Sequence, residues 1–301
     1  YPSGGETFAA LASLATREQA FTGLDLHSTY GRDVDVLVLD VDETLRSAGR
    51  TDNEIPRETL HLLTRFHDDG VPIVICTGQT LENVKGFLIQ GLGNELVYSG
   101  DVSIVYEAGT GVFTPGHGER TKQLLYEDLD EQIRTTFRGV RSRVLSAAPE
   151  HLRRGCHLQG NEFNVTLKPN FETGSADAET VIDRGLIHLI DLLGEAVIDV
   201  RSGADGEIED VGIDADSTDG ADDDDADTNV GSQWARAHYG HLDPEISEVL
   251  EAAGETSDRD VESIPGPISD LLERVDVGYY HADAAEISSL ELNKVEGITA
   301  A

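Results

Sequence analysis

The sequence predicts an α/β protein in which a doubly wound, Rossmann-like parallel sheet is interrupted by an inserted α+β segment. Two aliphatic runs, 34–39 and 71–76, are each followed by a polar motif and then by a helix-like pattern. Strand, helix and strand in alternation are typical of doubly wound sheets. After Gly100 the pattern changes to short strands and longer helices, which indicates an insertion with its own core.

The first part of the chain is expected to form the parallel core. Residues 34–39 are a nearly continuous aliphatic run bounded by acids, which favours a central strand buried on both faces. A helix is expected from Pro56, which suits a first helical turn, to Gly70, which suits a C-terminal stop. Three further elements follow in chain order: a strand at 71–76, a helix from Thr80 to about Gly91, and a short strand at 95–98.

The segment after Gly100 is expected to begin with a β-hairpin at 102–113 and to continue as a mixed insertion. Its further elements are expected in this order: a helix at 119–147, a strand at 163–168, a helix at 176–193 and a strand at 196–200. The strand at 163–168 alternates polar and apolar residues, whereas the helices show a helical period. The insertion is therefore expected to fold as an α+β cap.

An acidic loop is expected within the insertion at 202–228. It holds almost no large apolar side chain and includes four aspartates at 222–225, so it is expected to be disordered. Asp214 and Asp216 imitate the first ligands of a calcium-binding loop. Asp219 stands where that loop needs glycine, so calcium is not expected here.

These patterns divide the chain into three parts. Residues 1–32 are an N-terminal appendage with a weak helical pattern at 5–20. Residues 33–100 and 277–301 are expected to form the core domain. The inserted cap domain is expected to span 101–276.

The charge balance excludes nucleic acid as an expected partner. Lys and Arg number 22 against 58 Asp and Glu, which gives a net charge of −36 and repels phosphate backbones. Eighteen of the basic residues are arginines, a bias that resembles proteins of extreme halophiles and predicts a haloarchaeon-like source. The alternative is an ordinary acidic protein with one acidic tail, but the acids are spread over the whole chain.

No segment suggests a membrane or a secretory route. No stretch approaches the roughly 18 apolar residues needed to cross a bilayer, and no charged-then-apolar leader opens the chain. A cytoplasmic protein with no membrane partner is expected. Cys76 and Cys156 lack metal-type spacing and are expected to be reduced, structural thiols. A protein partner is expected only through the acidic surface or the N-terminal appendage.

Two aspartates follow the first buried strand in the run 39–45, Leu-Asp-Val-Asp-Glu-Thr-Leu. Ligands of doubly wound sheets bind at this edge of the sheet. Where the strand leaves the sheet, Asp40 and Asp42 can reach one phosphate, so that one attacks phosphorus and the other moves a proton. The alternative is an acidic turn that only ends a strand.

A second polar motif, Thr77-Gly78-Gln79-Thr80, follows the second strand. A hydroxyl and backbone N–H groups beside a helix N-terminus form an anion site. Taken alone, Thr77 is more often a plain helix cap. Its position one helix after Asp40 favours a role in phosphate binding.

These two motifs resemble those of the haloacid dehalogenase superfamily, in which the first strand ends in DxDxT and the second in Thr or Ser. The resemblance implies that Asp40 is the nucleophile, that Asp42 is the general acid and base, and that both hold Mg²⁺. It also implies that Thr44 and Gly78 contact the phosphate. Glu43 stands where many members have glycine, which bears on the subfamily rather than on the chemistry.

The resemblance implies a third motif, a lysine that holds the nucleophile and the phosphate together by charge. Lys294 is the choice, because the run 290–298 is expected to end a strand and begin a helix. The runner-up is Lys168 on the inserted strand, which is otherwise expected to contact substrate. Thr77 and Lys294 would together neutralise the transferring phosphoryl group.

A fourth motif, an acidic turn of GDxxxD type that completes the magnesium shell, is expected one strand after the helix that begins at Gly297. The sequence stops before that position, starts with Tyr1 and contains no methionine, so it is expected to be trimmed at both ends. Asp283 and Glu286 precede Lys294 and are not expected to replace the fourth motif.

The place of the insertion resembles the large-cap, Cof-type subclass of sugar-phosphate phosphatases. The expected activity is therefore magnesium-dependent hydrolysis of a small phosphorylated metabolite, such as a sugar phosphate. The polar side of 162–168 either faces the active site or faces solvent. The rival functions are a phosphotransferase or mutase, which differs in its acceptor, and a catalytically silent subunit or scaffold.

Overall fold

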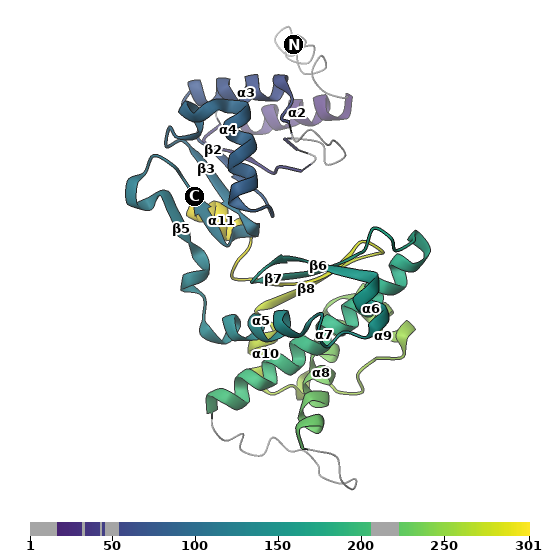
Figure 1. Cartoon of the computed structure of the whole chain (residues 1–301). Helices are drawn as coiled ribbons and strands as arrows, with labels where there is room; N and C mark the ends of the chain where they lie inside the picture. The colour runs from purple at the N-terminus through teal and green to yellow at the C-terminus, as the bar shows by residue number, and fades with distance from the viewer. Residues whose placement is uncertain (1–16, 32–33, 43, 46–53, 206–222) are drawn as a thin grey trace.

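The computed structural model describes residues 17–31, 34–42, 44–45, 54–205 and 223–301. They form two domains joined at a narrow junction (Figure 1). The helix expected at 5–20 lies almost entirely outside the described residues. Within the N-terminal appendage, the described residues form the helix α2 (Arg17–Tyr30).

The first domain contains a five-stranded sheet in the order β1-β2-β3-β4-β5. Its strands are β1 (Leu37–Leu39), β2 (Ile73–Cys76), β3 (Val102–Tyr106), β4 (Gly111–Phe113) and β5 (Lys122–Leu124). β1, β2 and β3 are parallel, with Leu37 opposite Ile73 and Ile73 opposite Val102. β3, β4 and β5 pair antiparallel, so the hairpin expected at 102–113 is confirmed.

Helices cover both faces of this sheet. They are α3 (Arg57–Asp68), α4 (Leu81–Val97) and α11 (Lys294–Ala300). Ile73 and Ile75 of β2 pack with α3 and α4. Val74 and Cys76 point to the opposite face, where Ile298 of α11 packs against them. Successive residues of one strand thus serve opposite layers, and the prediction of a doubly wound α/β core is confirmed.

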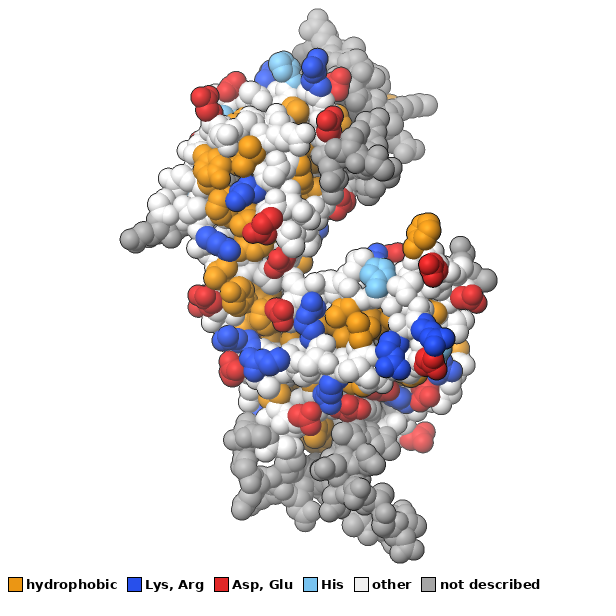
Figure 2. All heavy atoms as spheres, viewed as in Figure 1, with side chains coloured by type: hydrophobic (Ala, Val, Ile, Leu, Met, Phe, Trp, Pro, Cys, Tyr) orange, Lys and Arg blue, Asp and Glu red, His pale blue; other side chains and the backbone are white. Residues whose placement is uncertain are grey.

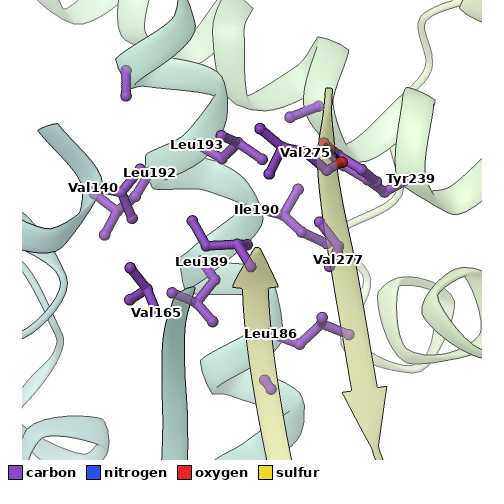
Figure 3. Packing of buried hydrophobic residues seen from close by; sticks show 14 of the residues in the cluster. Val140, Val165, Leu186, Leu189, Ile190, Leu192, Leu193, Tyr239, Val275 and Val277 are labelled. Atoms are coloured by element: carbon purple, nitrogen blue, oxygen red, sulfur yellow. Dashed lines mark hydrogen bonds between the residues drawn. The ribbon is translucent and has the colours of Figure 1, made fainter. Parts of the chain in front are cut away.

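The second domain is an antiparallel sheet packed on helices. The strands are β6 (Cys156–Asn161), β7 (Asn164–Pro169), β8 (Val275–Tyr280) and β9 (Ala284–Ser289), in the order β6-β7-β9-β8. The helices are α5 (Glu131–Arg143), α6 (Glu150–Gly155), α7 (Ser175–Asp205), α8 (Asp223–Leu242), α9 (Pro244–Ala253) and α10 (Gly266–Leu272). Figure 3 shows Leu186, Leu189 and Ile190 of α7 packed between Val165 and Val277 of the sheet. No helix of the described ranges has the length and apolarity to cross a membrane.

Short 3-10 turns lie on both sides of the junction: η1 (Glu107–Gly109), η2 (Gly118–Thr121), η3 (Leu125–Asp128) and η4 (Val261–Ser263). The chain leaves the core after β5 through η3 and returns from β9 to α11 (Figure 1).

The expected domain boundaries at 100/101 and 276/277 are wrong. Residues 102–124 supply β3, β4 and β5 of the core sheet, so the insertion begins only after β5. Residues 275–289 supply β8 and β9 of the cap sheet, so the return to the core comes after Ser289. The hairpin after Gly100 does not mark a change of domain, because parallel and antiparallel pairs occur within one sheet.

Three expected elements are also wrong. The strand at 95–98 belongs to α4, which continues past a break at Gly93, where φ is 82°. The strand at 196–200 is the C-terminal part of α7, because a short aliphatic run on a buried helix looks like a strand. The helix at 119–147 is divided into η2, β5, η3 and α5. Of the acidic loop at 202–228, both ends are helical in α7 and α8, and 206–222 lies outside the described residues.

The first strand is not central in the described part of the sheet. β1 lies at one end of the strand order and pairs only with β2 there. Val34, Val36 and Val38 are 42%, 46% and 39% exposed, so the expectation that 34–39 is buried on both faces is wrong. An aliphatic run shows that a strand is apolar, but it does not show how many strands pair with it. That number depends on the topology of the sheet.

Burial of the second cysteine predicts a specific loss of stability at alkaline pH. Cys156 is 3% exposed, its thiol donates to the carbonyl oxygen of Leu152 at 2.9 Å, and burial raises its pKa from 9.0 to about 11. A pKa raised on folding contributes stability that is complete below pH 9 and is lost as the pH rises through about 11.

The unfolding free energy of the wild type should therefore fall between pH 8 and pH 11. In Cys156→Ala, which lacks the thiol, we expect this fall to be smaller by about 2 kcal/mol. Urea denaturation followed by circular dichroism at several pH values measures both slopes. Other groups titrate in both proteins, so their contribution cancels in the difference. Equal slopes in the two proteins would contradict the assignment.

Candidate functional site

The aspartate pair lies in the turn that follows β1. Val41 is fully buried and Leu45 is 2% exposed, and the amide of Leu45 donates to the carbonyl oxygen of Val41 at 2.9 Å. These two apolar residues anchor the turn. Asp40 and Asp42 flank Val41 and are exposed, so both carboxylates are presented to solvent at the end of the strand.

Lys294, at the first position of α11, reaches the first of these aspartates. Its Nζ donates to Asp40 Oδ1 at 3.1 Å across a sequence separation of 254 residues. Asn293 caps the helix, because its side-chain oxygen accepts from the amides of Val295 and Glu296 at 2.8 and 3.1 Å. The geometric prediction that Lys294 lies beside Asp40 is confirmed.

Two glycines let α11 approach the core closely enough for this contact. A Cβ at Gly297 would lie 2.2 Å from Val105 Cγ1, and a Cβ at Gly109 would lie 2.0 Å from the carbonyl oxygen of Asn293. Gly109 also has a φ of 101°, which favours glycine. The helix that carries Lys294 is therefore positioned by backbone contact rather than by side-chain packing alone.

The thiol of Cys76 also lies close to this ion pair. Burial raises its pKa to about 11, while the Lys294 charge lowers the pKa and the Asp40 charge raises it. The Cys76 thiol donates weakly to the carbonyl oxygen of Lys294 at 3.9 Å. The ends of β1 and β2 and the start of α11 therefore converge on one place.

Thr77 follows β2 and is held rigidly at this edge. It is 1% exposed; its amide donates to Val105 at 2.9 Å, and its carbonyl oxygen accepts from Ala108 at 2.9 Å. Its hydroxyl oxygen accepts from the amide of Gln79 at 3.1 Å, which leaves the hydroxyl proton for a phosphate oxygen. The residue that precedes α4 is Thr80, so the alternative that Thr77 is the helix cap is wrong.

Gln79 is a site residue that the sequence argument missed. Its side-chain amide donates to both carboxylate oxygens of Asp42, at 3.1 and 2.9 Å. This contact holds the Asp42 side chain against the loop that carries Thr77. The available signal was its place in the second motif, at the sheet edge where the first motif also ends.

A turn with left-handed backbone joins the site to the cap. Glu107 and Ala108 have φ values of 49° and 56°, which is uncommon for residues other than glycine. The Glu107 amide donates to the Gln79 carbonyl oxygen at 2.9 Å, and the Glu107 carbonyl oxygen accepts from Asn161 Nδ2 at 2.6 Å. This turn was expected only to close a hairpin, and its role in joining the domains was missed.

The other predicted phosphate contacts differ in their placement. Thr44 and Gly78 are exposed beside Asp42 and Thr77 in the two converging loops. Lys168 lies on β7 and forms an ion pair with Asp283 at 3.2 Å. The hollow that Lys168 lines does not include Lys294. The structure therefore does not bring Lys168 together with the aspartate pair, and Lys294 is the lysine beside Asp40.

A hollow of about 350 Å³ lies between the domains at this place. Lys294 and Asn293 line it from the core, and Asn164, Glu286 and Ser288 line it from the cap sheet. The two domains leave an open space between them in Figure 2. Asn164, at one end of the polar side of β7, therefore shares a hollow with Lys294, whereas Lys168 at the other end does not.

Asp40 and Asp42 are the residues that would hold a magnesium ion. Carboxylate oxygens are the hard ligands that Mg²⁺ prefers, and Mg²⁺ usually takes one or two carboxylates together with water and phosphate oxygens. Among the residues that the structure describes, no group of three or more His, Cys, Asp and Glu side chains converges as a cation site. The donor set thus fits a magnesium ion that also depends on substrate oxygens.

Residues 37–112, from β1 to β4, match the model of the haloacid dehalogenase-like hydrolase family. The resemblance drawn from the two aspartate and threonine motifs is therefore confirmed for this part of the chain.

Solved structures similar to the chain include Plasmodium falciparum IMP-nucleotidase, at 11% identity and a TM-score of 0.46, over 99% of this chain and 60% of that chain. A haloacid dehalogenase-like hydrolase from B. subtilis is 14% identical, with a TM-score of 0.39, over 88% and 77% of the two chains. A subclass IIB sugar phosphatase is 14% identical, with a TM-score of 0.35, over 89% and 74%. The chain spans 60% of the length of the IMP-nucleotidase chain. No curated protein sequence matches the chain.

The close approach at Gly109 predicts a large cost for a single methyl group. Gly109→Ala should destabilise the fold because the new Cβ meets the Asn293 carbonyl at 2.0 Å, in addition to the left-handed φ. Gly254→Ala is the matched control, because Gly254 has a φ of 71° and nothing within 4 Å of an added Cβ.

Both variants carry the backbone cost of alanine at positive φ, which is about 1 kcal/mol. Only Gly109→Ala carries the steric cost, so we expect it to lose at least about 1 kcal/mol more than the control. Urea denaturation at a fixed salt concentration measures both. Equal losses would show that α11 is not held by this contact.

Proposed function

We propose that this chain carries the active site of a magnesium-dependent phosphomonoester hydrolase that works through an aspartyl-phosphate intermediate. The observation that carries the proposal is the 3.1 Å contact of Lys294 with Asp40, beside the loops of Asp42 and Thr77. Two carboxylates, a hydroxyl and an ammonium group at the end of parallel strands form a suitable set for phosphoryl transfer. The proposed substrate is a small phosphorylated metabolite, such as a sugar phosphate.

In the first step, a carboxylate oxygen of Asp40 attacks the phosphorus atom and the ester P–O bond breaks. Asp42, in its protonated form, gives its proton to the leaving oxygen, which departs as an alcohol. The Thr77 hydroxyl donates to a phosphoryl oxygen, and Lys294 offsets the negative charge of Asp40 and of the phosphoryl group. These contacts allow an anionic nucleophile to approach an anionic substrate.

In the second step, water attacks the phosphorus atom of the aspartyl-phosphate. The Asp42 carboxylate takes a proton from this water, the bond between Asp40 and phosphorus breaks, and inorganic phosphate leaves. Gln79 supports this role, because its amide holds both Asp42 oxygens and so fixes the side chain that moves the proton. Gln79 acts here as a positioning residue.

The proposed magnesium ion would be held by Asp40 and Asp42 together with oxygens from substrate and water. When bound, it supplies positive charge that reduces the repulsion between the carboxylates and the phosphate. The local charge is otherwise balanced only in part, because Lys294 is one ammonium group beside two carboxylates. A divalent cation is therefore consistent with the charge of the site.

The two rival functions remain distinguishable. A phosphotransferase or mutase uses the same first step and passes the phosphoryl group to an acceptor other than water. A silent subunit or scaffold would keep the fold without turnover. Release of inorganic phosphate in water supports the hydrolase over both.

Removal of the nucleophile should abolish turnover without unfolding the protein. We expect Asp40→Asn to lower the hydrolysis of p-nitrophenyl phosphate by at least about 1,000-fold, because a neutral amide does not attack phosphorus. Asp35→Asn is the matched control, since Asp35 is an exposed aspartate before the same strand. Activity of Asp40→Asn equal to that of Asp35→Asn would rule out the nucleophile.

The two candidate lysines should separate clearly in the same assay. We expect Lys294→Gln to lower kcat/KM by about 100-fold or more, the usual effect of losing one charged group that stabilises a transition state. Lys168→Gln, which breaks only the exposed pair with Asp283, should cost less than about threefold. The reverse order of effects would overturn the assignment of Lys294.

A further inference from the structure

The hollow beside Lys294 continues into a second hollow along the junction. The first has a volume of about 350 Å³ and the second about 410 Å³. They share four lining residues, Glu107, Thr110, Asn161 and Phe163. We call the two together the junction groove. Its one end is Lys294, and its other end is α5 of the cap.

The far end of the junction groove holds two arginines, two glutamates and aromatic side chains. Arg134 and Arg138 line it from α5, four residues apart and therefore on one face of the helix. Both arginines pair with Glu131, at 3.4 and 3.7 Å, and all three side chains are at least one-third exposed. Such exposed pairs are weak, so both guanidinium groups can turn to a stronger anion.

An aromatic wall adjoins these arginines. The rings of Tyr126 and Phe163 are stacked with centroids 6.0 Å apart, and Phe137 meets Phe163 edge-on at 6.1 Å. Tyr126 and Phe163 both line the far hollow. The carboxylates of Glu107 and Glu162 and the amide of Asn161 lie on the same surface, where they can accept from or donate to hydroxyl groups.

A hydrogen bond joins the core and the cap in the middle of the groove. Asn161 Nδ2 in the cap donates to the Glu107 carbonyl oxygen in the core at 2.6 Å. Arg141 of α5 in turn donates to the Asn161 carbonyl oxygen at 2.6 Å. Core, β6 and α5 are thus tied together at this point, which suits a groove that selects ligands by length.

From this geometry we propose that the substrate carries a second anionic group, phosphate or carboxylate, which Arg134 and Arg138 bind while its phosphate ester lies at Lys294. The hydroxylated or ring-bearing skeleton between the two groups lies along Phe163 and the polar residues of the groove. This inference rests on the proposed function for the identity of the Lys294 end. The arginine end stands on its own geometry.

Binding to the Asp40→Asn protein tests the inference without turnover. Isothermal titration calorimetry at one fixed ionic strength would compare glucose 6-phosphate, which has one anionic group, with glucose 1,6-bisphosphate and 6-phosphogluconate, which have two. We expect at least one of the two probes with two anionic groups to bind about tenfold more tightly than glucose 6-phosphate, which corresponds to about 1.4 kcal/mol.

The preference should vanish when the arginines are neutralised. In Asp40→Asn with Arg134→Gln and Arg138→Gln, the affinity ratio should fall to near one. The control carries Arg153→Gln and Arg154→Gln instead, an equal loss of charge on exposed residues of α6, and should keep the ratio. If the double variant does not fold, the single substitution Arg138→Gln is used, because this side chain is 66% exposed and its loss should not unfold the protein. Arg138→Gln should lower the affinity ratio at least threefold.

The inference would be overturned if neither probe with two anionic groups bound more tightly than glucose 6-phosphate. It would also be overturned if the preference survived the loss of both arginines. Hydrolysis of p-nitrophenyl phosphate by the wild-type protein is measured separately. Absence of that hydrolysis together with an arginine-dependent preference would reject the proposed function and keep the anion site. Hydrolysis of p-nitrophenyl phosphate without an arginine-dependent preference would support the proposed function and reject the anion site.

Discussion

The ion pair between Lys294 and Asp40 determines how the rest of the site is built. It joins residues 254 positions apart, so it forms only when the chain has passed through the whole cap and returned to the core sheet. Both side chains are nearly half exposed, at 46% and 44%, and an exposed pair contributes little to stability. Its significance is positional, because it requires α11 to lie directly over the ends of β1 and β2.

That position depends in turn on the turn at 107–109. Its left-handed residues cost free energy. This cost is offset by hydrogen bonds that the amides of Glu107 and Ala108 donate to Gln79 and Thr77, and by the one that Asn161 donates to Glu107. The same turn contacts Asn293 through Gly109, so one short segment touches the loop of Thr77 and Gln79, the cap and the helix that carries Lys294. A shift of this turn would move all three at once, which explains why backbone strain is retained there.

The residues of the candidate site were easier to predict than the architecture around them. Asp40, Asp42 and Thr77 lie directly after aliphatic strands, which placed them at one sheet edge, and the resemblance to a known family then supplied their roles and the search for a lysine that led to Lys294. Gln79 and Glu107 were missed because their roles arise from contacts between distant segments. The place of β1 in the sheet and the shared use of residues 102–124 by the core were missed for the same reason. Pairing partners are a property of the topology, which no local period encodes.

The insertion of the cap between β5 and α11 has a consequence for biosynthesis. Strands β1 to β5 all precede residue 125, whereas α11 begins at residue 294, so the ribosome must make the whole cap in between. At 5 to 20 residues per second, that interval lasts from about ten to about thirty seconds. During this time Val74, Cys76, Val105 and Val112 lack the helix that later covers them. A nascent chain with this topology therefore exposes an apolar sheet face throughout this interval, and a chaperone can bind that face.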